Sequence, residues 1–129
     1  MKFSDRVKAL ELPLDEVIVI GSGLLDQLGL REARDIDLAV TPGLFDKLVA
    51  TGSYQTGIIN GDRYCRNQIV DIWTGWHSDM PYEVLQKSAE MRDGVQFVAS
   101  AILVAKKRQR GSEKDLHDIA LLEEYYAGL

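Results

Sequence analysis

The chain has little of several residue types that define protein classes. Among its 129 residues there are one cysteine, Cys65, and two histidines, His77 and His117. A lone cysteine cannot form a disulfide within the chain, and no Cys or His cluster has the spacing of zinc ligands. These shortages exclude an internal disulfide framework and argue against a histidine-rich metal site.

Long hydrophobic runs are also missing. The longest apolar stretches, residues 17–20 and 101–105, are far shorter than the roughly 20 residues that cross a bilayer. The first residues lack the apolar run of a secretory signal. We therefore expect a cytoplasmic protein that does not enter a membrane.

Composition and charge fit one folded domain spanning residues 1–129. Apolar residues make up 46% of the chain and charged residues 27%, which is typical of globular proteins. The net charge of −5 opposes nucleic-acid binding over the whole surface. Five of the residues from 106 to 114 are nevertheless basic, so a local anion site stays open.

Hydrophobic periodicity and capping residues predict alternating helices and strands. We expect helices over residues 4–11, 24–28, 42–49, 79–93, 100–107 and 113–126, and strands over residues 17–20, 35–40, 54–59, 63–65, 68–74 and 95–98. Ser4, Thr41, Ser100 and Ser112 are the expected helix caps, and Asn60-Gly61 is a hairpin turn signal. This order predicts an α/β or mixed α+β fold, a mixed β-sheet with flanking helices.

A glycine turn, Gly21-Ser22-Gly23, follows the strand predicted over residues 17–20. A strand-to-helix turn presents unpaired backbone N–H groups and the positive end of a helix dipole, which together bind phosphate. The Ser22 hydroxyl can donate to a phosphate oxygen. The same turn is equally an ordinary helix start. Asp26 replaces the third glycine of a dinucleotide fingerprint, and the lack of Gly-Lys-Ser or Gly-Lys-Thr excludes a P-loop.

Two aspartates stand on one face of the strand predicted over residues 35–40. Asp35 and Asp37 are two positions apart, about 6.6 Å along an extended backbone. Their charges repel, and one pKa should rise unless cations lie between them. Two Mg²⁺ ions roughly 3.5 to 4 Å apart supply such charge in enzymes that bind phosphates. An isolated pair of this kind is also common on exposed edge strands and in turns.

A third acid, Asp71, strengthens the metal hypothesis. It lies within the apolar run Ile69 to Trp73, where an unpaired aspartate is expensive to bury. If that strand lies beside residues 35–40, three carboxylates converge on one metal site.

Together these motifs resemble those of the DNA polymerase β-like nucleotidyltransferase superfamily. The matching segments are Ile20-Gly21-Ser22, Asp35-Ile36-Asp37-Leu38 and Val70-Asp71-Ile72. Lys107 and the segment from Glu113 to Ile119 are similar to the tail of small, single-domain bacterial members. Ser112 stands where such relatives often have arginine, and Arg110 is the nearby basic residue that can substitute for it.

The resemblance implies a mixed sheet with flanking helices, a reaction and a set of residue roles. Gly21 and Ser22 would hold a nucleoside triphosphate, such as ATP. Asp35 and Asp37 would bind two Mg²⁺ ions, for which Mn²⁺ can substitute. Asp71 would bind the catalytic metal and help to activate an acceptor hydroxyl. The reaction transfers a nucleoside monophosphate to that hydroxyl and releases pyrophosphate.

The basic tail has two interpretations. Lys107 and Lys114 can neutralise the leaving pyrophosphate, since lysine acts as a mobile point charge for phosphate. Alternatively, Lys114 and Asp118 are four apart on a helix and form a surface ion pair. Asp115 is expected to complete a capping box with Ser112 rather than to bind a ligand.

Two tryptophans and a histidine, Trp73, Trp76 and His77, closely follow the third acid. They can stack on a base or accept a proton, although core and rim packing is the more common role of such residues.

Other functions fit the same residues. A non-catalytic binding module, such as an antitoxin-like or regulatory partner, would keep the fold and use the acidic cleft for protein contact. A metal-dependent hydrolase would use the same carboxylates. The acceptor of a transferase is equally open among RNA ends, protein side chains and small hydroxylated molecules.

Overall fold

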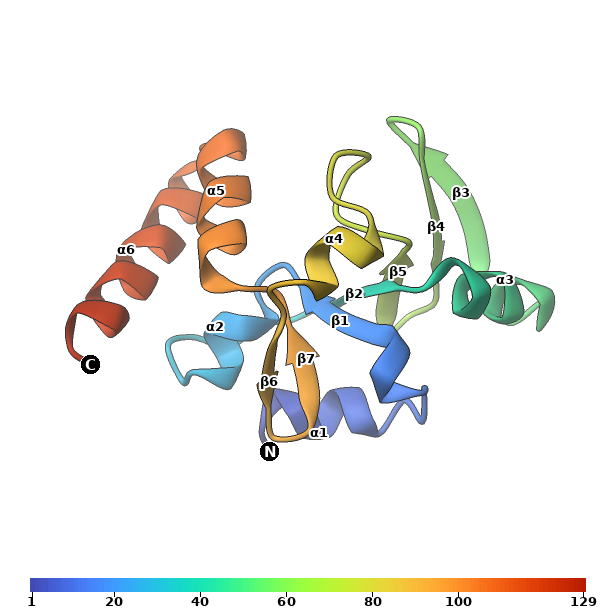
Figure 1. Cartoon of the computed structure of the whole chain (residues 1–129), viewed down its shortest axis with the longest axis horizontal. Coiled ribbons are helices and arrows are strands. Elements are labelled where there is room, and N and C mark those ends of the chain that lie inside the picture. Colours follow the sequence, from blue (N-terminus) through green and yellow to red (C-terminus); the bar gives the residue numbers. More distant parts are fainter.

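The computed structural model describes all 129 residues, and its centre is a seven-stranded mixed sheet (Figure 1). The strands are β1 (Val17–Ile20), β2 (Ile36–Val40), β3 (Gln55–Ile59), β4 (Asp62–Arg66), β5 (Val70–Trp73), β6 (Glu90–Arg92) and β7 (Val95–Phe97). They lie in the order β3-β4-β5-β2-β1-β7-β6. β2 runs parallel to β5 and β1 runs parallel to β7, while the other neighbours are antiparallel. The expected mixed sheet is confirmed.

Six α-helices and one short 3₁₀ helix surround this sheet. They are α1 (Phe3–Lys8), the 3₁₀ helix η1 (Leu14–Glu16), α2 (Gly23–Gln27), α3 (Pro42–Ala50), α4 (Tyr82–Gln86), α5 (Ser100–Arg110) and α6 (Glu113–Ala127). α5 and α6 pack on each other at the end of the molecule where β1 runs into α2 (Figure 1). None of the helices has both the length and the apolarity that a bilayer crossing requires.

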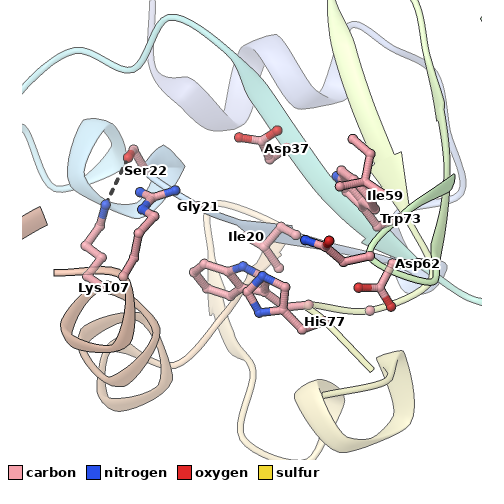
Figure 2. Close-up of a pocket in the computed structure, with 13 residues that line it drawn as sticks. Ile20, Gly21, Ser22, Asp37, Ile59, Asp62, Trp73, His77 and Lys107 are labelled. Carbon is pink, nitrogen blue, oxygen red and sulfur yellow. Dashed lines mark hydrogen bonds between the residues drawn. The ribbon is translucent and has the colours of Figure 1, made fainter. Parts of the chain in front are cut away.

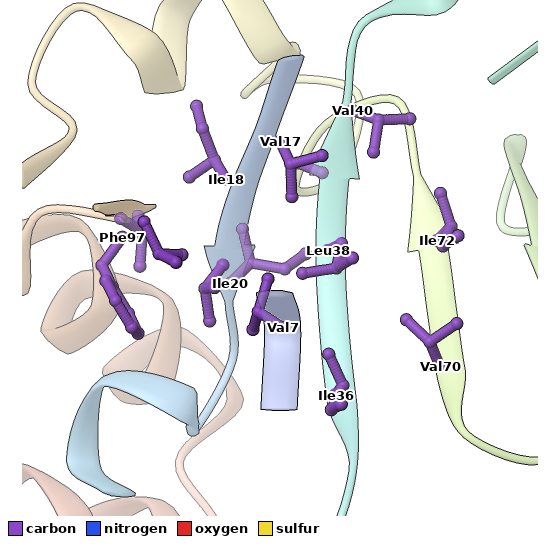
Figure 3. Packing of buried hydrophobic residues seen from close by; sticks show 14 of the residues in the cluster. Val7, Val17, Ile18, Ile20, Ile36, Leu38, Val40, Val70, Ile72 and Phe97 are labelled. Atoms are coloured by element: carbon purple, nitrogen blue, oxygen red, sulfur yellow. The ribbon is translucent and has the colours of Figure 1, made fainter. Parts of the chain in front are cut away.

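The core is one contiguous cluster of 26 buried residues. β1 lies in the middle of the sheet, so both of its faces are covered and all four of its residues are buried. Figure 3 shows β1 side chains beside those of β2, with β5 on the far side of β2. Leu103 of α5 and Leu122 of α6 belong to the same cluster. The C-terminal helices therefore pack against the sheet, as expected.

Several expected boundaries are confirmed by local geometry. The Thr41 hydroxyl caps α3 by accepting a hydrogen bond from the backbone N–H of Leu44 at 3.2 Å. Ser112 and Asp115 form a reciprocal capping box at the start of α6. Asn60 and Gly61 have φ angles of 52° and 83°, which suit the turn of a two-residue hairpin.

The helix expected over residues 79–93 is wrong. Its helical part is only α4, and the chain then forms the β6–β7 hairpin. Asp93 and Gly94 have φ angles of 49° and 81°, so they make the hairpin turn instead of ending a helix. Asp-Gly is a strong signal for such a turn, and this signal outweighs the helical periodicity before it.

Two of the expected caps are also wrong. Ser4 is fully buried within α1, which starts at Phe3 with Lys2 as its cap. Ser100 is the first residue of α5, whose cap position belongs to Ala99. α5 continues to Arg110, three residues beyond the expected end.

Two helical glycines allow a matched test of packing around the start of α2. A Cβ atom on Gly23 would lie 2.5 Å from Cγ1 of Val19 and 2.6 Å from Cε1 of Phe3, whereas a Cβ on Gly43 of α3 meets nothing within 4 Å. We expect Gly23→Ala to lower the free energy of unfolding by about 1–3 kcal/mol through overpacking. Gly43→Ala should raise it by about 0.4–1 kcal/mol. Urea unfolding measures both, and equal effects of the two variants would contradict the close packing of Gly23.

Candidate functional site

Two of the expected carboxylates lie side by side in the sheet. β2 and β5 are parallel neighbours, and Asp37 is in register with Asp71. Residues in register on neighbouring strands point to the same face, so both carboxylates project from one side of the sheet. The hypothesis that the Asp71 strand lies beside the Asp37 strand is confirmed.

Asp37 is in an environment that disfavours its charged form. Burial raises its pKa most, and the negative charges of Asp71 and Asp35 raise it further. Arg66 and Arg110 act in the opposite direction, and the resulting pKa is about 6 instead of 3.8. A positive charge placed beside Asp37 would favour its ionised form and lower this pKa.

The three aspartates do not form a three-ligand group in this structure. Asp35 is exposed and directly precedes β2, and no cluster of three His, Cys, Asp or Glu side chains is close enough to hold a metal ion. Arg66 Nε lies 3.0 Å from Oδ1 of Asp71, in an ion pair that lacks the alignment of a hydrogen bond. The site is thus a close pair, Asp37 and Asp71, with Asp35 nearby.

The glycine turn touches this pair. Ile20, the last residue of β1, is in register with Asp37, and the chain turns at Gly21 with a φ of 69°. A Cβ atom on Gly21 would lie 3.0 Å from Oδ2 of Asp37. Glycine is therefore required here both for its left-handed backbone and for the close approach of the carboxylate.

Ser22 takes part in a side-chain network instead of capping α2. It occupies the cap position, but its side chain makes no capping hydrogen bond. Its Oγ accepts from Nη2 of Arg31 at 2.8 Å and from Nζ of Lys107 at 3.3 Å. The turn is therefore held by cations from two other parts of the chain.

A buried aspartate organises the same cations. The Asp118 side chain, 0% exposed, accepts from Nε of Arg31 at 2.6 Å, Nη2 of Arg31 at 2.7 Å and Nζ of Lys107 at 2.8 Å. Burial raises the pKa of Asp118, but the hydrogen bonds from Arg31 and Lys107 outweigh it and hold the pKa below its usual range. Asp118 therefore stays ionised.

Asp115, also buried on α6, forms a second ion pair, with Arg110, whose side chain is largely exposed. It accepts two hydrogen bonds from Arg110 at 2.6 and 2.8 Å, which hold its pKa well below the usual range. It also completes the cap with Ser112, as expected. Arg110 thus reaches the site from the end of α5. This position is consistent with the expectation that Arg110 takes the place of a basic residue where the chain has Ser112.

Lys114 does not join these residues. It is exposed on α6 and makes no ion pair, so the expected Lys114–Asp118 surface pair is absent. Asp118 points inward to Arg31 and Lys107 instead. Lys107, in contrast, is buried and lines the cavity.

Sequence reasoning missed Arg31. It lies between α2 and β2 and follows no periodic pattern, so no signal in the sequence distinguishes it from a surface arginine. For Asp118, the sequence indicates only a place in the C-terminal tail segment and a surface pair with Lys114, and its burial is not predicted.

A cavity of about 280 Å³ connects the glycine turn to the tryptophans (Figure 2). Its wall consists of Ile20, Gly21, Ser22, Asp37, Ile59, Asn60, Asp62, Trp73, Gly75, Trp76, His77, Lys107 and Arg110. Figure 2 shows Ser22 and Lys107 on one side of the opening and Trp73, Ile59 and Asp62 on the other. Trp73 and Trp76 also pack partly on the core, so they serve packing and line the cavity at once.

Comparison with models of protein families, with curated proteins and with solved structures finds no match to this chain. The site is therefore interpreted from its own geometry.

Removing the Asp37 charge should change how stability depends on pH. The folded-state pKa of about 6 lies above the usual 3.8, so ionising Asp37 costs free energy that is absent below pH 3.8 and complete above pH 6. We expect Asp37→Asn to stabilise the metal-free protein at pH 7.5, by at most about 3 kcal/mol, and to have little effect near pH 4. Urea unfolding at both pH values with a chelator present measures this. A pH-independent effect would contradict the raised pKa.

Arg31 should contribute strongly to folding. In Arg31→Ala, Asp118 keeps Lys107 but loses its two hydrogen bonds to the guanidinium, which should cost about 1–3 kcal/mol or more. Arg34→Ala is the control, because Arg34 is exposed and its side chain makes no hydrogen bond or ion pair. Thermal and urea unfolding of the two variants gives the difference. Similar stabilities would show that Asp118 does not depend on Arg31.

Proposed function

We propose that this chain is a metal-dependent nucleotidyltransferase that transfers a nucleoside monophosphate from a nucleoside triphosphate, such as ATP, to an acceptor hydroxyl and releases pyrophosphate. The observation that carries the proposal is the position of Asp37. It is in register with Asp71, touches the Gly21 turn and lines a cavity whose other wall holds Lys107.

The donor set fits Mg²⁺. Asp37 and Asp71 would supply oxygen ligands. The pKa of Asp37 is raised by burial first and then by the charges of Asp71 and Asp35, so a cation beside it would favour the ionised form. Mg²⁺ is usually held by one or two protein carboxylates, with water and substrate phosphates completing its shell, so a three-residue cage is not required. Once bound, the ion would neutralise charge on the phosphates during transfer. Asp35 is close enough to affect the pKa of Asp37 and would add negative charge to the site.

The cationic side of the cavity suits the phosphates of the donor. α2 has only five residues, so the helix dipole expected at the glycine turn is a small contribution. Lys107 and Arg110 supply full positive charges at the cavity wall, and the Ser22 hydroxyl lies between Lys107 and Arg31. Pyrophosphate leaving toward this side would be neutralised as its charge develops.

The in-line geometry of the transfer determines the side from which the acceptor hydroxyl would approach. The attacking and leaving oxygens lie roughly opposite each other across the transferred phosphorus. With the leaving group near Lys107 and the carboxylates in the centre, the attacking hydroxyl would approach from the side of β5. Asp71 is the carboxylate on that strand and would accept a hydrogen bond from the hydroxyl.

A non-catalytic binding module is the second candidate, and the Arg66–Asp71 pair favours it. Arg66 already neutralises Asp71, so Asp71 has a structural partner without any metal. In that case Asp71→Asn would leave the biological function unchanged, and the protein would co-purify with a stable protein partner.

Calorimetry with Mg²⁺ and ATP tests the nucleotidyltransferase proposal. We expect wild type to bind Mg²⁺–ATP, and Asp37→Asn to weaken this binding at least about tenfold, the equivalent of about 1.4 kcal/mol. Asp46→Asn is the control, because Asp46 is 70% exposed on α3. No heat from wild type, or equal binding by Asp37→Asn, would reject the proposal. Release of monophosphate without a modified acceptor would identify a hydrolase instead.

A further inference from the structure

The chain has two tryptophans, and both line the cavity. Trp73 lies on the side opposite Lys107, together with Ile59 and Asp62 (Figure 2), and Trp76 and Asn60 also line the cavity. The cavity thus has a cationic half and an aromatic half, with Asp37 between them. A phosphate group by itself does not need the second half.

Trp73 is fixed beside the carboxylates by the sheet. It follows Asp71 by two residues on β5, so both side chains project from the same face. Its register partner on β2 is Ala39, whose small side chain leaves room above the strand. On β4 the Tyr64 ring packs against the indole, with centroids 5.3 Å apart. One side of the indole is therefore braced, and the cavity lies on another.

Trp76 is held by a loop that α5 anchors. Its backbone N–H donates to the carbonyl of Met80 at 2.7 Å, which closes the loop on itself. The next residue, His77, has a left-handed φ of 62°, an uncommon conformation for a residue with a side chain. Lys106, whose side chain is only 5% exposed, reaches from α5 to Nδ1 of His77 at 3.0 Å and Oδ1 of Asp79 at 2.9 Å. A nearly buried ammonium group thus maintains a strained loop at the cavity wall.

Polar groups at the turn between β3 and β4 complete this half. Asn60 offers both a donor and an acceptor, and Asp62 offers acceptors. A nucleobase has a flat apolar face and a polar edge, which match an indole and these side chains respectively. The volume of about 280 Å³ is that of the whole cavity, which includes the cationic half.

We propose that Trp73 and Trp76 form a subsite for a planar ring with a polar edge, bound by stacking on an indole, by hydrogen bonds with the Asn60 amide and by hydrogen bonds that the Asp62 carboxylate accepts. The ring is either the base of the nucleotide donor or a ring of the acceptor. This assignment of the ring to a substrate rests on the proposed function, whereas ring binding itself needs neither metal nor phosphate.

Adenosine, which carries a ring but no phosphate, is the probe for the subsite, and inorganic tripolyphosphate is the probe for the cationic half. We expect adenosine to change the intrinsic tryptophan fluorescence of wild type. Calorimetry should show that Trp76→Leu weakens adenosine binding about 5- to 150-fold, the range that one base stacked on an aromatic side chain contributes. The affinity for tripolyphosphate should stay unchanged.

Matched variants separate stacking from folding. Tyr125→Leu removes an aromatic ring from α6 outside this cavity and should leave adenosine binding unchanged. Trp76→Phe keeps a stacking face and should retain most of the affinity even if Trp76→Leu unfolds. Loss of adenosine binding in Tyr125→Leu, or equal affinity in wild type, Trp73→Leu and Trp76→Leu, would overturn the subsite.

Competition identifies the source of the ring. If Mg²⁺–ATP displaces adenosine, the subsite binds the donor base; if adenosine binds equally well to the protein saturated with Mg²⁺–ATP, the subsite belongs to the acceptor. Asp37→Asn distinguishes the two proposals, because it should weaken Mg²⁺–ATP binding at least about tenfold and leave adenosine binding intact. Wild type that binds none of adenosine, guanosine, cytidine and uridine would refute the subsite, even if it binds Mg²⁺–ATP.

Discussion

The arrangement of the site depends on the burial of one charge, that of Asp118. Burying an isolated carboxylate costs several kcal/mol, so α6 can dock only where cations meet it. Those cations are Arg31, from the loop after α2, and Lys107, from α5. Both also donate to Ser22 Oγ. The same two cations therefore fix both the docking of the C-terminal helices and the position of the glycine turn. The residues involved are far apart in the sequence.

This constraint also sets the charge at one end of the cavity. Three cations, Arg31, Lys107 and Arg110, meet two buried carboxylates, Asp115 and Asp118, which leaves one positive charge in excess. The carboxylates hold the cations in place, so an arriving anion need not order flexible side chains. In the proposed function, these fixed charges would contribute more to phosphate binding than the dipole of the short helix α2.

The sequence predicts the strands of the site, because their residue patterns are local. It does not predict side chains whose partners are distant in the sequence. The run at residues 17–20 and the alternation from Asp35 identify β1 and β2 because burial and strand geometry act over a few residues. The pairing of β2 with β5, which brings Asp71 beside Asp37, joins strands that are distant in the sequence, so the sequence offers it only as a condition. Arg31 carries no such pattern, since its role comes only from the docking of α6. The β6–β7 hairpin was missed for a different reason: its Asp93-Gly94 turn was interpreted as the end of a helix.

Some side chains of the site are positioned by the sheet and others by a loop. Strand register fixes Asp37, Asp71 and Trp73 in relation to one another, because all three project from neighbouring positions on β2 and β5. Trp76 has no such support and depends on the contact of Lys106 with the loop after β5. Lys106 and Lys107 are consecutive on α5, so one turn of this helix anchors the aromatic wall and also supplies the cation at the opposite wall. A shift of α5 would move both walls together, so the proposed ring subsite and the proposed phosphate site would be coupled.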